Sequence, residues 1–140
     1  MSSISIIETK ITSIRKYLAY LGDYKKYSKE EIEADDKLKR SLERYLYLVT
    51  QAAIDLAEAI ISYKEFRRPT AYTESFYILD EEKFITLSLS EKLVNMARFR
   101  NIIAHDYENV NFEIVYDAVQ NRLVDIEEFL SVVRGKLNLS

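Results

Sequence analysis

Glycine and proline are almost absent from this chain. Glycine occurs twice and proline once in 140 residues. These residues supply the backbone conformations of tight turns, and a sheet-rich fold needs many such turns. A bundle of long helices needs few of them. The scarcity of turn residues therefore predicts an all-α fold.

Apolar residues recur at steps of three and four, which is the spacing of a helix with one buried face. The first such stretch predicts a helix ending near Gly22. The second, from about Asp36 to Phe66, predicts a helix ~45 Å long, which leaves part of it free to project or to pair with another chain. The third stretch predicts a helix that follows Asn111, its predicted N-cap, and extends to Gly135. The apolar positions are Ile4, Ile7, Ile11, Ile14, Leu18 and Leu21; Leu38, Leu42, Tyr45, Val49, Ala52, Leu56 and Ile60; and Val115, Val119, Leu123, Ile126, Leu130 and Val133.

Capping signals mark two further helix starts. Ser28 with Glu31, and Ser88 with Glu91, each have the spacing of a capping box. The second pair precedes Leu93 and is expected to begin the helix that carries the most polar motif of the chain.

Pro69 is expected to close the long helix and to begin the only substantial connection, from Thr70 to about Leu87. Aromatic residues are spread through this segment, so we expect it to pack against the helices: Tyr72, Phe76, Tyr77 and Phe84. Four principal antiparallel helices with one short extra helix predict an up-and-down four-helix bundle. No repeat or composition change divides the chain, so residues 1–140 are expected to form a single domain.

Composition restricts the compartment and the partners. The chain has no cysteine, which excludes disulfides and thiolate chemistry. Its start lacks the basic and apolar regions of a signal peptide. The apolar run from Ala52 to Ile61 is interrupted by Asp55 and Glu58, so no membrane span is expected. We therefore expect a cytoplasmic protein. A net charge of −3 is unusual for a general duplex-DNA binder, so no DNA partner is expected and any RNA contact must be local.

The segment Arg100–Tyr107, with sequence RNIIAHDY, combines an arginine, the only histidine and a tyrosine. A guanidinium binds phosphate oxygens in a fixed geometry, and an imidazole transfers protons near neutral pH. Asn101 and Asp106 add supporting polar groups, while the apolar residues between them can anchor the segment. The combination indicates phosphodiester chemistry.

Spacing leaves the geometry of this motif open. On a continuous helix Arg100 and Tyr107 share a face, whereas His105 is turned away from Arg100. Convergence of Arg100 and His105 requires either that the helix loosens or ends between them, or that two chains contribute to one site. The simpler alternative is that His105 is an ordinary histidine near a helix end, that Arg100 is a solvated charge and that Tyr107 is an aromatic at the edge of the bundle.

Other kinds of site fit less well. A di-iron bundle needs glutamate three residues before the histidine, where this chain has Ile102. Acidic pairs such as Asp35–Asp36 are best explained as surface or helix-start charges, so neither a metal site nor a cofactor is expected. The basic residues Lys64, Arg67 and Arg68 are consistent with a phosphate contact, although a cationic helix C-terminus explains them more simply.

The motif resembles a known family. Arg100 and His105 match the arginine–histidine signature of HEPN domains, and Arg100, His105 and Tyr107 together resemble the R-x4-H-x-Y motif of HepT-type toxin ribonucleases. The similarity extends over most of the chain through Pro69, Tyr72, Phe76, Leu79, Met96, Phe99-Arg100-Asn101, Val115-Tyr116 and Ile126-Glu127-Glu128-Phe129.

This resemblance implies a homodimeric HEPN-like bundle that is the toxin of a type II toxin–antitoxin system. It implies metal-independent cleavage of RNA in a cleft between protomers, and a cognate antitoxin, a MntA-type minimal nucleotidyltransferase. It also implies that AMPylation of Tyr107 silences the toxin. Catalysis would rest on Arg100 and His105, with Asn101 and Asp106 in support.

The residue chemistry agrees with these implications. RNA supplies its own 2′-hydroxyl as nucleophile, so the protein needs only proton transfer by His105 and charge stabilisation by Arg100. One transesterification needs two proton transfers, and a two-fold dimer brings two histidines to one cleft. Two non-catalytic alternatives remain: a nucleotide- or partner-binding helical module, and a structural subunit for a nucleotidyltransferase.

Overall fold

The computed structural model describes residues 3–105 and 111–139. Within them every regular element is a helix, which confirms the predicted all-α class. The elements are α1 (Ser3–Gly22), the 3₁₀ helix η1 (Asp23–Lys26), α2 (Lys29–Ala34), α3 (Asp36–Lys64), α4 (Glu74–Glu81), α5 (Leu87–His105), α6 (Phe112–Asn121) and α7 (Leu123–Lys136).

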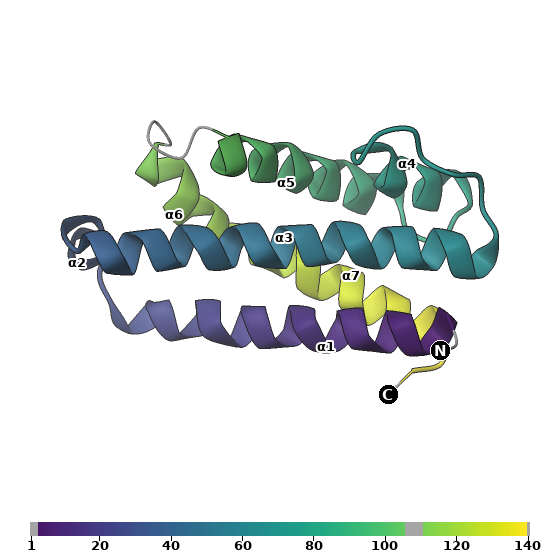
Figure 1. Ribbon diagram of the computed structural model, residues 1–140, viewed down its shortest axis with the longest axis horizontal. Helices are drawn as coiled ribbons and strands as arrows, with labels where there is room; N and C mark the ends of the chain where they lie inside the picture. Colours follow the sequence, from purple (N-terminus) through teal and green to yellow (C-terminus); the bar gives the residue numbers. More distant parts are fainter. Residues whose placement is uncertain (1–2, 106–110, 140) are drawn as a thin grey trace.

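The long helices alternate in direction, as predicted for an up-and-down bundle. Figure 1 shows α1, α3, α5 and the pair α6–α7 running back and forth, with both termini at one end. The central helix is α3, which α1, α2, α4 and α5 all contact, while α7 packs against α5 and α6. The buried residues of α3 extend from Leu42 to Ile61, so most of its length belongs to the core.

The apolar character of α3 reflects this central position. By length and composition α3 is long and apolar enough to cross a membrane. However, 56% of its most apolar window is buried inside the molecule, and the core helix of a bundle passes the same test. The apolarity of α3 is therefore explained by the helices that cover it.

Two of the predicted helix starts are confirmed. The Ser28 hydroxyl accepts from the Glu31 backbone N–H at 3.1 Å, and the Glu31 carboxylate accepts from the Ser28 N–H at 2.9 Å. The Asn111 side chain accepts from the backbone N–H of Glu113 at 2.8 Å and caps α6.

The predicted start of α5 at Ser88 is wrong. The helix begins at Leu87, and the hydroxyl of Thr86 accepts from the Leu89 N–H at 3.1 Å. Leu89 is already buried, so the apolar face of the helix begins a turn before Leu93. Ser88 therefore lies inside the first turn and not at its cap.

The predicted connection between α3 and α5 contains a helix of its own, α4. The expectation that its aromatic residues pack against the bundle is confirmed for Phe76, which is buried and meets Phe129 edge-on with ring centroids 5.7 Å apart. The Ser90 hydroxyl donates to the carbonyl of Phe76 at 2.9 Å and joins α4 to α5. The segment is thus a fixed part of the structure.

The single helix predicted from Asn111 to Gly135 is two helices. The break falls at Arg122, between α6 and α7. The apolar spacing runs from Val119 to Leu123 to Ile126 without a change of phase, and neither proline nor glycine marks the break. The pattern therefore gives no sign of it.

Candidate functional site

The predicted site lies at the C-terminal end of α5. This helix is continuous from Leu87 to His105, so it neither loosens nor ends between Arg100 and His105. Five positions along a helix correspond to a rotation of about 140° around its axis. The two positions therefore do not share a face of α5. Asp106 and Tyr107 lie outside the described residues.

Arg100 is half-buried against two tyrosines. Its guanidinium carbon lies 5.1 Å from the ring centroid of Tyr72 and 5.7 Å from that of Tyr47. Both distances are within the range of a cation–π interaction. Tyr47 belongs to α3, and Tyr72 to the connection that precedes α4. Residues far apart in sequence thus form a cradle for one arginine.

The hydrogen bonding of Arg100 leaves donors for a ligand. Its Nη1 donates to the Asn101 side-chain oxygen at 3.5 Å, the outer limit of such a bond. Its Nε is buried and has no hydrogen-bond partner among the described residues. The N–H groups of a guanidinium are the part that binds phosphate or carboxylate, and no carboxylate among the described residues pairs with those of Arg100. The arrangement suits an anion.

The basic cluster predicted at the end of α3 divides into different roles. Arg67 forms ion pairs at 3.0 Å with Glu74 and with Glu81, so its charge is compensated. Glu74 also accepts from the backbone N–H of Thr70 at 2.9 Å, and this bond, followed by Arg67, holds the pKa of the Glu74 carboxyl below its ordinary value. These contacts secure the connection that carries Tyr72.

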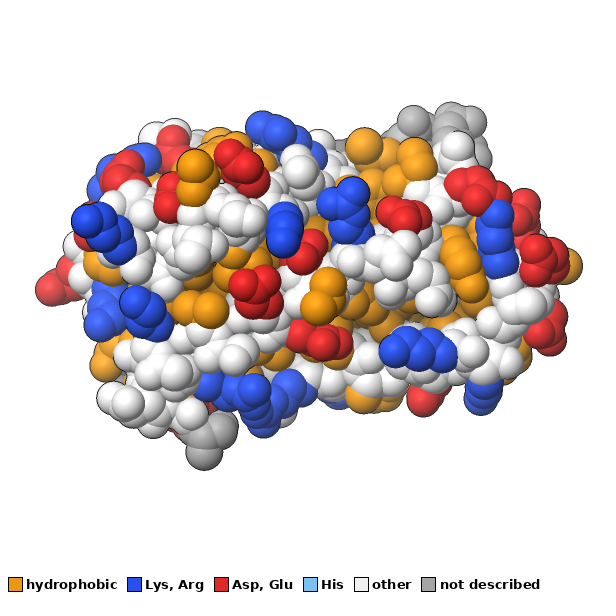
Figure 2. Space-filling model, turned by 180° about the vertical axis from the view of Figure 1, so that it is seen from behind, with side chains coloured by type: hydrophobic (Ala, Val, Ile, Leu, Met, Phe, Trp, Pro, Cys, Tyr) orange, Lys and Arg blue, Asp and Glu red, His pale blue; other side chains and the backbone are white. Residues whose placement is uncertain are grey.

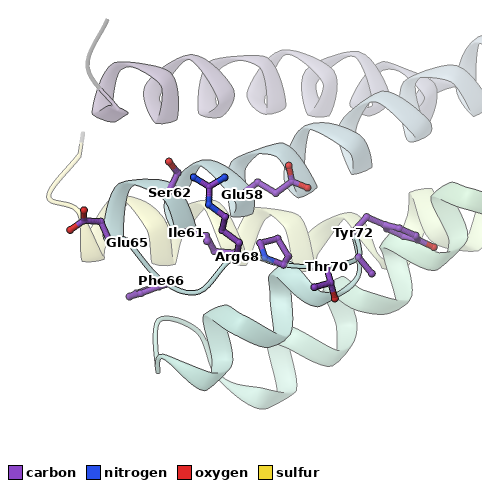
Figure 3. Close-up of a pocket in the computed structure, with 10 residues that line it drawn as sticks. Glu58, Ile61, Ser62, Glu65, Phe66, Arg68, Thr70 and Tyr72 are labelled. Carbon is purple, nitrogen blue, oxygen red and sulfur yellow. The ribbon is translucent and has the colours of Figure 1, made fainter.

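The other two members of the cluster stay exposed. Lys64 lies in the last turn of α3, where the helix dipole favours a cation. Arg68 lines an open pocket of about 720 Å³. Figure 3 shows the Arg68 side chain extending between Ser62 and Glu58, with Tyr72 at the opposite end from Phe66. The full lining is Glu58, Ile61, Ser62, Glu65, Phe66, Arg68, Pro69, Thr70, Ala71 and Tyr72.

Tyr72 contributes to both the pocket and the cradle of Arg100. The pocket is therefore continuous with the predicted site through one side chain. Glu58 also lines this pocket. Partial burial, followed by the nearby Asp55, raises the pKa of its carboxyl. The Glu58 carboxyl in the pocket lining is thus a weaker acid than an ordinary surface glutamate.

Sequence reasoning missed Arg44. Its guanidinium carbon lies 5.3 Å from the ring centroid of Tyr47, the same ring that faces Arg100. Arg44 and Tyr47 are three residues apart in α3, the spacing at which helical side chains are neighbours. That spacing is visible in the sequence, but the link to Arg100 depends on how α3 and α5 pack.

One member of the acidic pair Asp35–Asp36 has a structural role. Asp35 caps α3 by accepting from the Leu38 N–H at 3.1 Å, as expected for a helix-start charge. Across the described part of the chain no three histidine or acidic side chains gather closely enough to hold a metal ion.

Comparison with known proteins identifies the family. Residues 7–133 match the family described as ribonuclease HepT-like. The chain belongs to this family. The resemblance that the Arg100–Tyr107 motif suggested is thereby confirmed.

Two curated HepT relatives are nucleases by name. The "mRNA nuclease HepT" of Shewanella oneidensis is 31% identical over 135 residues, covering 94% of this chain and 98% of the relative. The "tRNA nuclease HepT" of Aphanizomenon flos-aquae is 28% identical over 114 residues, covering 81% of this chain and 78% of the relative.

A solved structure of a HepT relative supports the same assignment. The tri-AMPylated HEPN toxin of Shewanella oneidensis, in complex with its MNT antitoxin, superposes with a TM-score of 0.86 at 31% identity. The match covers 96% of this chain and 99% of that one. The bundle described above is therefore the HEPN fold.

Proposed function

We propose that this chain is the toxin of a toxin–antitoxin pair and cleaves RNA without a metal. The observation that carries the proposal is the state of Arg100: half-buried, within cation–π distance of Tyr47 and Tyr72, with a buried Nε that lacks a partner among the described residues. An anion-binding group of this kind, five residues before the only histidine of the sequence, suits phosphate chemistry. Relatives named as mRNA and tRNA nucleases support the choice of RNA.

The proposed reaction is a transesterification. The 2′-oxygen of one nucleotide attacks the adjacent phosphorus, the bond from phosphorus to the 5′-oxygen breaks, and the products carry a 2′,3′-cyclic phosphate and a 5′-hydroxyl. His105 accepts the proton of the 2′-hydroxyl or donates one to the departing oxygen. Arg100 stabilises the negative charge that develops on the phosphate, and Asn101 helps to orient its guanidinium.

The active enzyme is proposed to be a homodimer. One chain offers a single histidine, and the continuity of α5 turns positions 100 and 105 away from each other. A two-fold axis near the end of α5 would bring Arg100 of one protomer and His105 of the other into a common cleft. It would also supply the second histidine that the two proton transfers require.

Regulation is proposed to act on Tyr107. Transfer of AMP from ATP to the tyrosine oxygen, with pyrophosphate leaving, would add bulk and negative charge at the cleft and repel RNA phosphates. The proposed partner is a MntA-type nucleotidyltransferase antitoxin, and the proposed compartment is the cytoplasm. The AMPylated state of the Shewanella oneidensis HEPN toxin supports this form of control.

The test is RNA cleavage by the purified chain in the presence of EDTA. We expect the wild type to cleave cellular RNA to products with cyclic phosphate ends. Arg100→Ala and His105→Ala should each lower the rate by at least about 100-fold. Exposed Arg15 lies on α1, on the opposite side of α3 from α5, and Arg15→Ala serves as the matched control (Figure 1).

Equal cleavage by the wild type and both site variants would sink the ribonuclease assignment. The alternative, a nucleotide-binding module without turnover, predicts that nucleotides raise the melting temperature while RNA stays intact. In this alternative the Arg100 guanidinium binds a phosphate group, and His105 transfers no proton to or from the bound nucleotide.

A further inference from the structure

Two arginines and two tyrosines alternate across the candidate site. We call the set Arg44, Tyr47, Arg100 and Tyr72 the cation–aromatic series. The three successive separations between guanidinium carbon and ring centroid are 5.3, 5.7 and 5.1 Å. Each member therefore contacts the next, and the series joins α3, α5 and the connection before α4.

Neither arginine of the series forms an ion pair with a carboxylate among the described residues. Arg40, one helical turn before Arg44, differs: it lies 3.8 Å from Asp36 and 3.1 Å from Glu43. A carboxylate occupies the N–H edge of a guanidinium, whereas a ring occupies its face. Arg44 and Arg100 thus each lie against a tyrosine ring, and no carboxylate among the described residues neutralises their charge.

Both arginines contact one ring, so their guanidinium carbons are separated by no more than the sum of two short distances. This separation is compatible with adjacent phosphates of one nucleic-acid strand. At the other end of the series, Tyr72 faces Arg100 and also lines the pocket of about 720 Å³. A pocket of this size can hold one nucleotide.

We propose that the cation–aromatic series binds a single strand of RNA on both sides of the scissile phosphate. Arg100 holds the scissile phosphate, Arg44 holds the neighbouring phosphate, and a base stacks on Tyr72 inside the pocket. The inference rests on the proposed ribonuclease function, because it extends the site around Arg100. Arg44 and Tyr72 act in it as positioning residues.

The chemistry favours a single strand over a duplex. Alternating cations and aromatic rings are the usual surface for single-stranded nucleic acid, where bases are free to stack. A paired base could not enter the pocket beside Tyr72. The chain as a whole carries a charge of −3, so affinity for RNA must depend on a few local cations such as these.

The test is fluorescence anisotropy with a short, labelled, single-stranded RNA of mixed sequence, 2′-O-methylated so that it cannot be cleaved. Arg44→Gln should weaken binding by about five- to tenfold at ~0.1 M salt. It should also reduce the slope of log K against log salt by about 0.7, the value for one phosphate contact in a single strand. Arg15→Gln removes an equal charge at an exposed position of α1 and should change neither the affinity nor the salt slope.

Tyrosine variants test the stacking step separately. Tyr72→Leu should weaken binding by about fivefold or more without changing the salt slope, because stacking releases no counterions. Tyr72→Phe retains the ring and should bind as the wild type does. Circular dichroism of each variant checks that the helices are intact.

The outcomes for the two proposals are separable. Unchanged affinity and salt slope in Arg44→Gln, or no binding by the wild type, would overturn the proposal that the cation–aromatic series binds RNA. If the wild type cleaves RNA in that case, the ribonuclease function stands without it. If the methylated RNA binds as expected but the same RNA without methyl groups is not cleaved, the cation–aromatic series stands as an RNA-binding site and the ribonuclease function fails.

Discussion

Neighbouring side chains decide what each arginine of this protein can do. Arg67 lies between Glu74 and Glu81, and its guanidinium is used up in holding the connection before α4. Arg100 lies between two tyrosine rings, which fix its position without neutralising it. The two residues have the same chemistry in the sequence. Only their surroundings separate a structural ion pair from a candidate anion site.

Asp125 offers a prediction about pH at the residue scale. It lies in the first turn of α7, is 6% exposed, and burial raises its pKa against the opposing influence of Lys92 and Arg122. A carboxyl whose folded pKa is above its unfolded value binds more protons in the folded state. Stability therefore falls as pH rises from the unfolded pKa through the folded pKa.

We therefore expect Asp125→Asn to raise the melting temperature at neutral pH and to lose this advantage as the pH approaches about 4, the ordinary value for aspartate. Thermal unfolding followed by circular dichroism over that range measures both effects. Exposed Glu127 on the same helix supplies the control, Glu127→Gln. An Asp125→Asn variant that is less stable than the wild type at neutral pH would contradict the argument.

At the scale of the helices, the sequence predicts what depends on local chemistry. The end of α1 near Gly22, the extent of α3 and the caps at Ser28 and Asn111 all follow from residues close in sequence. The break at Arg122 could not be predicted, because the apolar spacing passes through it unchanged. Helix α4 was missed because its eight residues are held by packing against α3 and α5.

The start of α5 provides a direct test of capping. Thr86→Ala removes the hydroxyl that accepts from the Leu89 N–H, and an N-cap of this kind is worth about 1 kcal/mol. For a chain of this size that loss should lower the melting temperature by roughly 3–6 °C. Ser88→Ala removes a hydroxyl two residues later, inside the helix, and should cost little or nothing. A larger loss at Ser88 than at Thr86 would place the cap where the sequence pattern expected it.

At the scale of the whole molecule, the candidate site shows the reach and the limit of the sequence. The arginine and histidine are recognised from one short motif because their chemistry is local. The tyrosines that hold Arg100 come from α3 and from the connection before α4, and only the packing of the bundle brings them together. Figure 2 shows acidic and basic side chains interspersed over the far face, so net charge alone does not locate an RNA surface.

Two large apolar side chains are exposed to solvent near the C-terminal end of α5. Ile102 on α5 is 52% exposed and Ile114 on α6 is 53% exposed. Ile114 also lines, with Phe99, a shallow groove of about 190 Å³ between these helices, and Ile102 follows Phe99 by one turn. Exposed apolar side chains beside a candidate site suit an interface between copies of the chain.

This surface allows the proposed dimer to be tested by one substitution. In a two-fold interface each residue faces the same surface of its partner, so Ile102→Glu would introduce two buried charges. We expect this variant to be monomeric by light scattering and inactive toward RNA. Leu87→Glu is the matched control, because Leu87 is 54% exposed at the opposite end of the same helix. It should keep both the dimer and the activity. A dimeric and active Ile102→Glu protein would move the interface elsewhere, whereas a monomeric but active one would show that a single chain suffices for cleavage.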